Sequence, residues 1–168
     1  DETHLMLYGS GQGLGNSLKV KNLKKPGADW GTVEPSQDYE ISVYDVIDGK
    51  MYIYTNYGAP RYRMMTADVN SPERENWKEF IPEGSGVLTG CSFAGDKLIV
   101  EYNIDACSRA YLYTLAGEQI REIQLPTYGS AGFSSSKKHD EVFYTFTSFT
   151  YPSAIYRYDL ESGKSELY

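Results

Sequence analysis

Short runs of apolar and aromatic residues recur along this chain at a nearly constant interval. Four of them share this character and lie at residues 4–8, 51–54, 97–100 and 141–144. Their central residues, Met6, Met51, Leu98 and Val142, are separated by steps of 45, 47 and 44 residues. A fixed period of this length indicates a structural unit that repeats along the chain.

Each run belongs to a group of short segments with strand character. A second apolar segment follows each run, at residues 17–20, 62–65, 110–113 and 154–158. An amphipathic third segment follows at residues 77–81, 120–125 and 164–167. Another strand precedes the later runs, at residues 41–44, 87–91 and 129–133. Turn-forming pairs such as Asp48-Gly49 and Gly95-Asp96 separate the segments, so the pattern predicts antiparallel strands.

Four short strands in about 45 residues is the spacing of a β-propeller blade. The chain is therefore predicted to be an all-β propeller fragment of about four blades, with boundaries at residues 1–34, 35–83, 84–126 and 127–168. The first blade lacks its inner strand and the other three are complete. Residues 51–54 and 142–146 are almost continuously apolar, which predicts strands covered on both faces. Such a row leaves a bare blade face at each end, so we expect it to be part of a larger ring.

Composition supports an all-β chain and excludes several kinds of partner. The 168 residues include 16 Tyr, 6 Phe and 2 Trp, residue types that favour strands. A formal net charge of −7 argues against a nucleic-acid partner. No run approaches the ~20 apolar residues of a transmembrane helix, and the first residues lack the pattern of a signal peptide. One helical turn is expected at residues 71–75, with Ser71 as N-cap and Pro72 at the first position.

Two motifs look like functional sequences but occur in the wrong context. Residues 9–15 are rich in glycine, yet they match neither phosphate-binding pattern and no helix follows, so they are interpreted as a hairpin loop. Residues 90–94 come close to the nucleophile elbow around Ser92, but a turn and another strand follow where the elbow needs a helix. The two histidines, His4 and His139, lie in a terminal segment and in a hairpin. No catalytic residue is therefore assigned.

Metal and cofactor chemistry is not expected either. Cys91 and Cys107 fit no metal-binding spacing, and whether they pair as a disulfide stays open. Acidic residues near Glu73 and Glu161 are interpreted as solvated loops, because nothing in their spacing nominates a catalytic pair. The signature residues of sialidase, WD40 and kelch propellers are missing. We therefore assign no cofactor and no metal ligand.

Several segments resemble the later blades of the propeller domain in the prolyl oligopeptidase family. The most specific is residues 140–160, where Ser-Phe-Thr-x-Pro is followed by Ile-Tyr-x-Tyr-Asp-Leu. Residues 55–63 resemble the family's TNxxAPxxR turn, and Trp77-Lys78 follows at the expected distance. Leu125-Pro126 and residues 129–134 resemble its blade junction. The resemblance extends from about Leu5 to Tyr168.

This resemblance implies the gating part of a serine peptidase that cleaves short peptides after proline. In the family a seven-bladed propeller caps an α/β-hydrolase domain that carries the Ser-Asp-His triad, and it excludes folded proteins from the nucleophile. No residue of the triad has a counterpart here, so the chain alone is expected to be inert. Its expected partners are the hydrolase domain, the missing blades and, for the intact enzyme, proline-containing peptides, with no membrane partner. The compartment, cytoplasm or periplasm, stays open.

An alternative function is a stand-alone propeller scaffold that binds a protein or a peptide. Exposed tyrosines would then act as amphipathic contact points, although tyrosine is also common in packed strands. The two hypotheses differ in solution behaviour. A free-standing module would be monodisperse, whereas an excised row of blades would self-associate through its bare faces.

Overall fold

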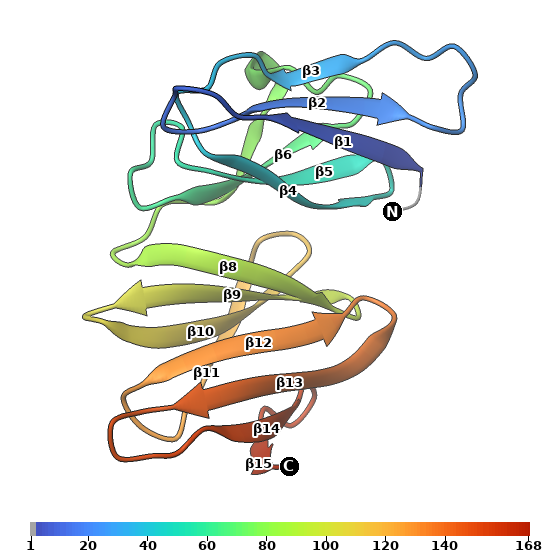
Figure 1. Cartoon of the computed structure of the whole chain (residues 1–168). Helices are drawn as coiled ribbons and strands as arrows, with labels where there is room; N and C mark the ends of the chain where they lie inside the picture. Colours follow the sequence, from blue (N-terminus) through green and yellow to red (C-terminus); the bar gives the residue numbers. More distant parts are fainter. Residues whose placement is uncertain (1–2) are drawn as a thin grey trace. The chain divides into compact units, whose positions relative to one another are not determined.

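The computed structural model describes residues 3–168, and these form four antiparallel sheets (Figure 1). Within each sheet, strands that follow one another in the chain lie side by side. The sheets fall into two compact units that divide after Gly84, with two sheets in each unit. The all-β prediction is confirmed, and so is the four-strand repeat with one strand missing from the first sheet.

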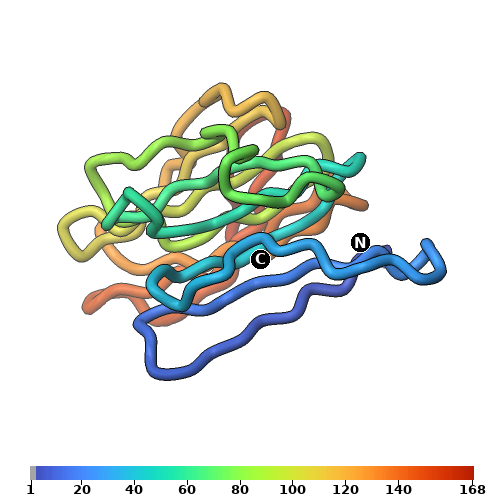
Figure 2. Tube along the Cα trace, turned by 90° about the horizontal axis from the view of Figure 1, so that it is seen from above, coloured from blue at the N-terminus to red at the C-terminus, as the bar shows by residue number. Residues whose placement is uncertain are grey.

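The first unit contains a sheet of three strands and a sheet of four. The strands of the first sheet are β1 (His4–Gly9), β2 (Ser17–Asn22) and β3 (Gly31–Glu34). Those of the second sheet are β4 (Ile41–Ile47), β5 (Lys50–Thr55), β6 (Arg63–Asp68) and β7 (Lys78–Ile81). The connection between β2 and β3 extends beyond the ends of its strands (Figure 2).

The core of the first unit lies between these two sheets. Alternating residues of β2, Leu18 and Val20, are buried while Lys19 between them is exposed, as a strand with one covered face requires. Met51 and Ile53 of β5 pack into the same cluster. Tyr52, on the opposite face of β5, is also buried. The predicted burial of residues 51–54 on both faces of the strand is therefore confirmed for Met51, Tyr52 and Ile53, while Tyr54 is partly buried.

The second unit contains two sheets of four strands. The strands of the third sheet are β8 (Val87–Ala94), β9 (Lys97–Ile104), β10 (Cys107–Thr114) and β11 (Gln119–Ile123). Those of the fourth sheet are β12 (Ser130–Ser136), β13 (His139–Thr147), β14 (Ala154–Asp159) and β15 (Ser165–Leu167). Ile99, Leu112 and Ile123 of the third sheet pack against Val142, Tyr144 and Phe146 of the fourth.

The interpretation of residues 142–146 as covered on both faces is wrong. Val142, Tyr144 and Phe146 are buried, but Thr145 between them is exposed and Phe143 is only partly buried. The reason is that the third sheet packs against one face of β13, whereas Phe143, Thr145 and the neighbouring Ile155 on the other face remain accessible. Aromatic and β-branched residues suit a strand on either face, so the run alone does not report how many faces are covered.

The helical turn differs from its prediction in type and position. A 3₁₀ helix spans Arg74–Asn76, and its N-cap is Glu73 rather than Ser71. The N–H of Ser71 instead closes a turn by donating to the Asp68 carbonyl. The helix therefore begins two residues later than the Ser-Pro pair suggested, at Arg74 instead of Pro72. The sequence pattern also gave no strand at Gly31–Glu34, where only Val33 and Glu34 are buried.

Two-residue hairpins connect the first and second strands of the complete sheets. Asp48 and Gly49 both adopt positive φ, at 50° and 77°, which is the geometry of a type I′ turn. Gly95 has φ +55° in the corresponding position between β8 and β9. Asp105 and Ala106, between β9 and β10, adopt positive φ of 51° and 61° although neither is glycine. These tight turns fix the strand register in each sheet.

Candidate functional site

Ser92 does not lie in a nucleophile elbow. It is inside β8, which continues to Ala94 and then turns directly into β9. Its Oγ is buried and has no hydrogen-bond partner among residues 3–168. An elbow would place the hydroxyl at an exposed turn before a helix, so this motif is a strand segment of the third sheet. His139 is exposed at the start of β13.

The glycine-rich segment after β1 is a connection whose backbone lies against another loop. The N–H of Gly15 donates to the Gln37 carbonyl at 2.8 Å, and the N–H of Asn16 donates to the Tyr39 carbonyl at 3.0 Å. A Cβ at Gly15 would collide with the Tyr39 carbonyl. Glycine is therefore needed here for close packing of two backbones, and the interpretation of residues 9–15 as a hairpin loop is confirmed.

The two cysteines are both free thiols. Cys91 is opposite Val100 and Cys107 is opposite Ile104, so they flank β9 on two different strands at positions four residues apart. Burial, with a smaller contribution from Glu101, raises the pKa of the Cys91 thiol. Within residues 3–168, no group of three or more His, Cys, Asp or Glu side chains is arranged to hold a metal ion.

A carboxylate in the first unit is completely buried and is held by one arginine. Glu34, at the end of β3, has no exposed surface and forms an ion pair with Arg74 of the 3₁₀ helix. The guanidinium lies 4.2 Å from the Tyr57 ring centroid and 5.4 Å from that of Tyr39. The N–H of Ser36 donates to the second carboxylate oxygen at 2.8 Å.

This cluster joins the first sheet to the second. Burial acts to raise the pKa of Glu34, but hydrogen bonds from Arg74 and Ser36 outweigh it and hold that pKa below its ordinary value. Glu34 is therefore ionised at neutral pH and is compensated by Arg74. Because the carboxylate is completely buried and is paired with Arg74, we interpret the cluster as a structural joint between sheets rather than a catalytic site.

The segment that resembles the family turn is tied to the same region. The N–H of Glu40 donates to Asn56 Oδ1 at 2.8 Å, and the N–H of Tyr57 donates to Thr55 Oγ1 at 3.0 Å. The Tyr62 hydroxyl donates to Glu40 at 2.8 Å. The polar residues of this turn thus hold the β5–β6 loop against the connection between β3 and β4.

The second unit carries an aromatic surface at one end of its sheets, which we call the loop end. It is formed by the β9–β10 turn, the β11–β12 connection and the β13–β14 loop. Tyr128 and Tyr151 are exposed there and Phe149 is completely exposed. Between these segments lies a pocket of about 390 Å³, lined among others by Cys107, Tyr128 and Phe149. Exposed aromatic residues around a mainly apolar hollow indicate a contact surface.

An ion pair lies near this surface. Arg109 lies 5.7 Å from the Tyr128 ring centroid and donates to Glu122 at 3.3 Å. The acidic residues singled out in the sequence are otherwise placed as expected, since Glu73, Glu161 and Glu166 are exposed. None of the helices in residues 3–168 has the length and apolar character needed to cross a membrane.

Sequence reasoning missed the residues with the most unusual environments, Glu34 and Glu101. Single glutamates in strands with alternating patterns look like solvent-exposed positions. A signal for Glu34 did exist, because it follows the apolar Val33 directly and precedes Pro35. Its partner, however, lies 40 residues away, and no spacing rule connects them.

The sheets and the loop end define a class of protein: a segment of a β-propeller whose described residues hold a contact surface and no catalytic constellation. The family model for the N-terminal β-propeller domain of prolyl oligopeptidase matches residues 1–168. The chain therefore belongs to the prolyl oligopeptidase family, within its propeller domain.

Individual relatives agree with this assignment. The prolyl endopeptidase of Elizabethkingia miricola is 31% identical over the whole chain, which covers 24% of that protein. The dual function macrocyclase-peptidase POPB of Galerina marginata is 30% identical over 84% of this chain and 20% of its own length. The chain thus spans about a quarter of the first of these relatives and a fifth of the second.

Solved structures show the same fold. A structure from a study of two prolyl endopeptidases, concerned with inter-domain dynamics in catalysis and specificity, has a TM-score of 0.87 and 34% identity over 99% of this chain and 24% of its own. Prolyl oligopeptidase B of Galerina marginata, bound to a 35mer hydrolysis and macrocyclization substrate, has a TM-score of 0.87 and 26% identity over 98% of this chain.

Proposed function

We propose that this chain is part of the gating propeller of a serine peptidase that cleaves short peptides after proline. The observation that supports this function is the family match over all 168 residues. The chain would correspond to the later blades, at residues 1–34, 35–83, 84–126 and 127–168. Packed blades form a rigid wall, so only short or extended peptides would reach a nucleophile that lies outside this chain.

The purified chain and the intact protein are compared on a fluorogenic Gly-Pro substrate. We expect turnover by the intact protein alone, because the nucleophile and its base lie outside this segment. Turnover by the chain would contradict the assignment of catalysis to another domain. Absence of turnover by the intact protein would contradict the peptidase function itself.

The hydrolase domain is proposed to dock on the loop end of the second unit. This end exposes Tyr128, Phe149 and Tyr151, whereas the first-to-second strand hairpins at the opposite end are two-residue turns. Desolvating large aromatic side chains is a major source of stability in domain contacts. Burial of the area around the pocket against a partner domain would therefore stabilise the domain contact.

Docking is tested in the intact protein with Phe149→Ser, and Ile120→Ser serves as the control. Ile120 is exposed to 42% but lies at the start of β11, away from the loop end. We expect Phe149→Ser to loosen the domain contact. Faster limited proteolysis between the domains and increased cleavage of longer peptides would report this loosening. Equal behaviour of both variants would contradict docking at the loop end.

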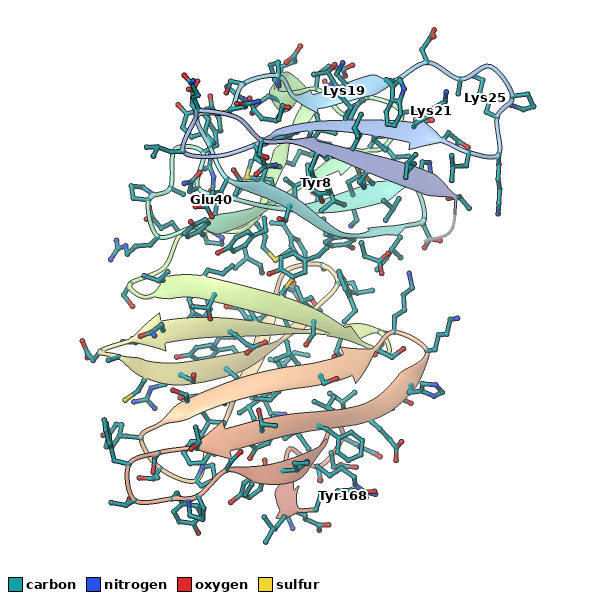
Figure 3. The ribbon with its side chains drawn as sticks, viewed as in Figure 1. Tyr8, Lys19, Lys21, Lys25, Glu40 and Tyr168 are labelled. Carbon is teal, nitrogen blue, oxygen red and sulfur yellow. The ribbon has the colours of Figure 1, made fainter. Side chains whose placement is uncertain are left out.

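The missing blades are proposed to cover the free faces of the first and fourth sheets. In the first sheet Leu5 and Leu7 are exposed, and Lys19 and Lys21 lie opposite them on the neighbouring strand (Figure 3). The free face of the fourth sheet carries Phe143 and Ile155, which lie opposite Arg157 and Thr145, with Tyr168 against Phe143 at 5.2 Å between ring centroids. Both faces combine apolar side chains with long charged ones, whose aliphatic stems can pack against the apolar surface of a neighbouring sheet.

The alternative, a stand-alone scaffold that binds a peptide, is supported by the apolar pocket at the loop end. Light scattering on the purified chain separates the two functions. Self-association at micromolar concentration is expected if the free sheet faces belong against other blades. A monodisperse, cooperatively unfolding monomer would contradict this and favour the scaffold.

A further inference from the structure

In the second unit, β12 of the fourth sheet is hydrogen-bonded to the third sheet at alternate positions. Ala131 donates its N–H to Ser108 Oγ at 2.9 Å. The N–H of Phe133 hydrogen-bonds Glu101. The Ser135 hydroxyl donates to the Phe93 carbonyl at 2.9 Å. Glu101 is the one group of these contacts that titrates, and it occupies the middle position.

Glu101 projects from β9 toward β12 between small neighbours. It lies opposite Gly90 on β8 and Ala110 on β10, and Ile99 on the same face of β9 belongs to the core between the sheets. Ser92 Oγ lies on this face at a diagonal position to Glu101, is buried, and has no hydrogen-bond partner in the described part of the chain. Diagonal neighbours are within reach of a long side chain.

We propose that Glu101 makes the contact between the third and fourth sheets sensitive to pH. With a neutral carboxyl the two sheets pack tightly, and with a carboxylate the contact between β9 and β12 loosens. A carboxylate at this position has no cation to compensate its charge, since Lys97 and Arg109 pair with other carboxylates, whereas the neutral acid needs none. The inference is independent of the peptidase function, because it concerns only the packing of the second unit.

The groups around Glu101 do not neutralise a negative charge. The strand β12 that faces it contains no titratable side chain. The charged or titratable groups on the other packed strands are Cys91 on β8, Lys97 and Tyr102 on β9, Cys107, Arg109, Tyr111 and Tyr113 on β10, and His139, Asp140, Glu141 and Tyr144 on β13. Lys97 is four residues away and pairs with Asp96, and Arg109 pairs with Glu122. This contrasts with Glu34, which Arg74 compensates directly.

Burial raises the pKa of Glu101 to about 7, with the Phe133 N–H acting in the opposite direction. A carboxyl whose pKa is higher when the two sheets are in contact than when they are apart stabilises the contact in its neutral form. That stability is complete below the ordinary pKa of 4.5 and is lost as the pH rises to about 7. Above this range the contact stays weakened and changes no further.

The test is hydrogen exchange of the Phe133 and Ala131 amides in the full chain, corrected for intrinsic exchange rates. Wild type, Glu101→Gln and the control Glu118→Gln, an exposed turn residue, are compared from about pH 5 to 8. In wild type and in Glu118→Gln we expect the protection of these two amides to fall about tenfold or more between about pH 5 and 7. This figure allows for partial solvent screening of the Glu101 charge. The fall should be absent in Glu101→Gln, because the amide mimics the neutral acid.

Constant protection in wild type, or the same fall in Glu101→Gln, would overturn the proposal. If Glu101→Gln does not fold, wild type alone decides. The Phe133 amide nitrogen shift is then followed against pH. A midpoint near 7 supports the switch, and a midpoint near 4.5 or no titration overturns it.

Discussion

At the scale of single residues, two glutamates illustrate how packing decides the chemistry of one residue type. Glu34 is fully buried beside Arg74, and the pKa of its carboxyl is lowered. Glu101 is largely buried without a cation, and the pKa of its carboxyl is raised. The ionised form is favoured where a partner offsets the loss of hydration, and it is disfavoured where none does.

Removing Arg74 should destabilise the first unit strongly. In Arg74→Ala the Glu34 carboxylate stays buried without a partner, which costs about 3 kcal/mol. Both tryptophans, Trp30 and Trp77, lie in the first unit, so urea unfolding followed by tryptophan fluorescence measures the change. The control Arg61→Ala breaks an exposed pair with Glu83 and should cost less than about 1 kcal/mol. Equal losses would show that Glu34 does not depend on Arg74.

The first unit should also lose stability in acid. Because the pKa of Glu34 is lowered in the folded state, its contribution is present above the ordinary value of 4.5 and is lost as the pH falls through the folded pKa. Urea unfolding between about pH 6 and 3, again by tryptophan fluorescence, should show a decline that is smaller in Glu34→Gln. The same decline in both proteins would assign the acid sensitivity to other carboxyls.

At the scale of elements, glycine at position 15 is required by the close approach of two loops. A methyl group there would collide with the Tyr39 carbonyl, so Gly15→Ala should lose about 2–3 kcal/mol. Gly132→Ala is a suitable control, because its nearest contact, Thr145 Oγ1, would be at an ordinary 3.7 Å. Thermal unfolding of both variants measures the difference, and a neutral Gly15→Ala would mean that the loops separate at little cost.

The hairpin between β9 and β10 places an alanine where the backbone favours glycine. Ala106 has φ +61°, a conformation that costs a residue with a Cβ about 1 kcal/mol. Ala106→Gly should therefore stabilise the second unit by up to about 1 kcal/mol. Ala116→Gly in the next turn, where φ is not positive, should be neutral or destabilising. Chemical denaturation monitored by circular dichroism compares the two.

At the scale of the whole molecule, the sheet faces without a neighbour should control self-association. Ile155 lies on the free face of the fourth sheet and is exposed to 47%. A lysine there disfavours burial, so Ile155→Lys should shift the purified chain toward monomer in light scattering. Phe149→Lys, at the loop end, should leave association unchanged. If only Phe149→Lys dissolves the assembly, the loop end and not the sheet face mediates it.

Much of this architecture was predictable because it depends on local chemistry. Strand positions followed from the alternation of residues such as Leu18, Lys19 and Val20, and hairpins followed from pairs such as Asp48-Gly49. The strand at Gly31–Glu34 and the 3₁₀ helix at Arg74–Asn76 were missed or misplaced, since tertiary contacts rather than strong local patterns fix them. The loop end was not predictable, because exposure of Phe149 depends on what packs nearby.

The sequence by itself determined the all-β class, the four-unit repeat and the family resemblance, because periodicity and turn chemistry are properties of neighbouring residues. Only the tertiary structure decided which faces are covered and which charges are compensated. The run at residues 142–146 is covered on one face alone, and Glu34 and Glu101 have opposite pKa shifts. Burial and ion pairing join residues that are distant in the chain, so no local pattern encodes them.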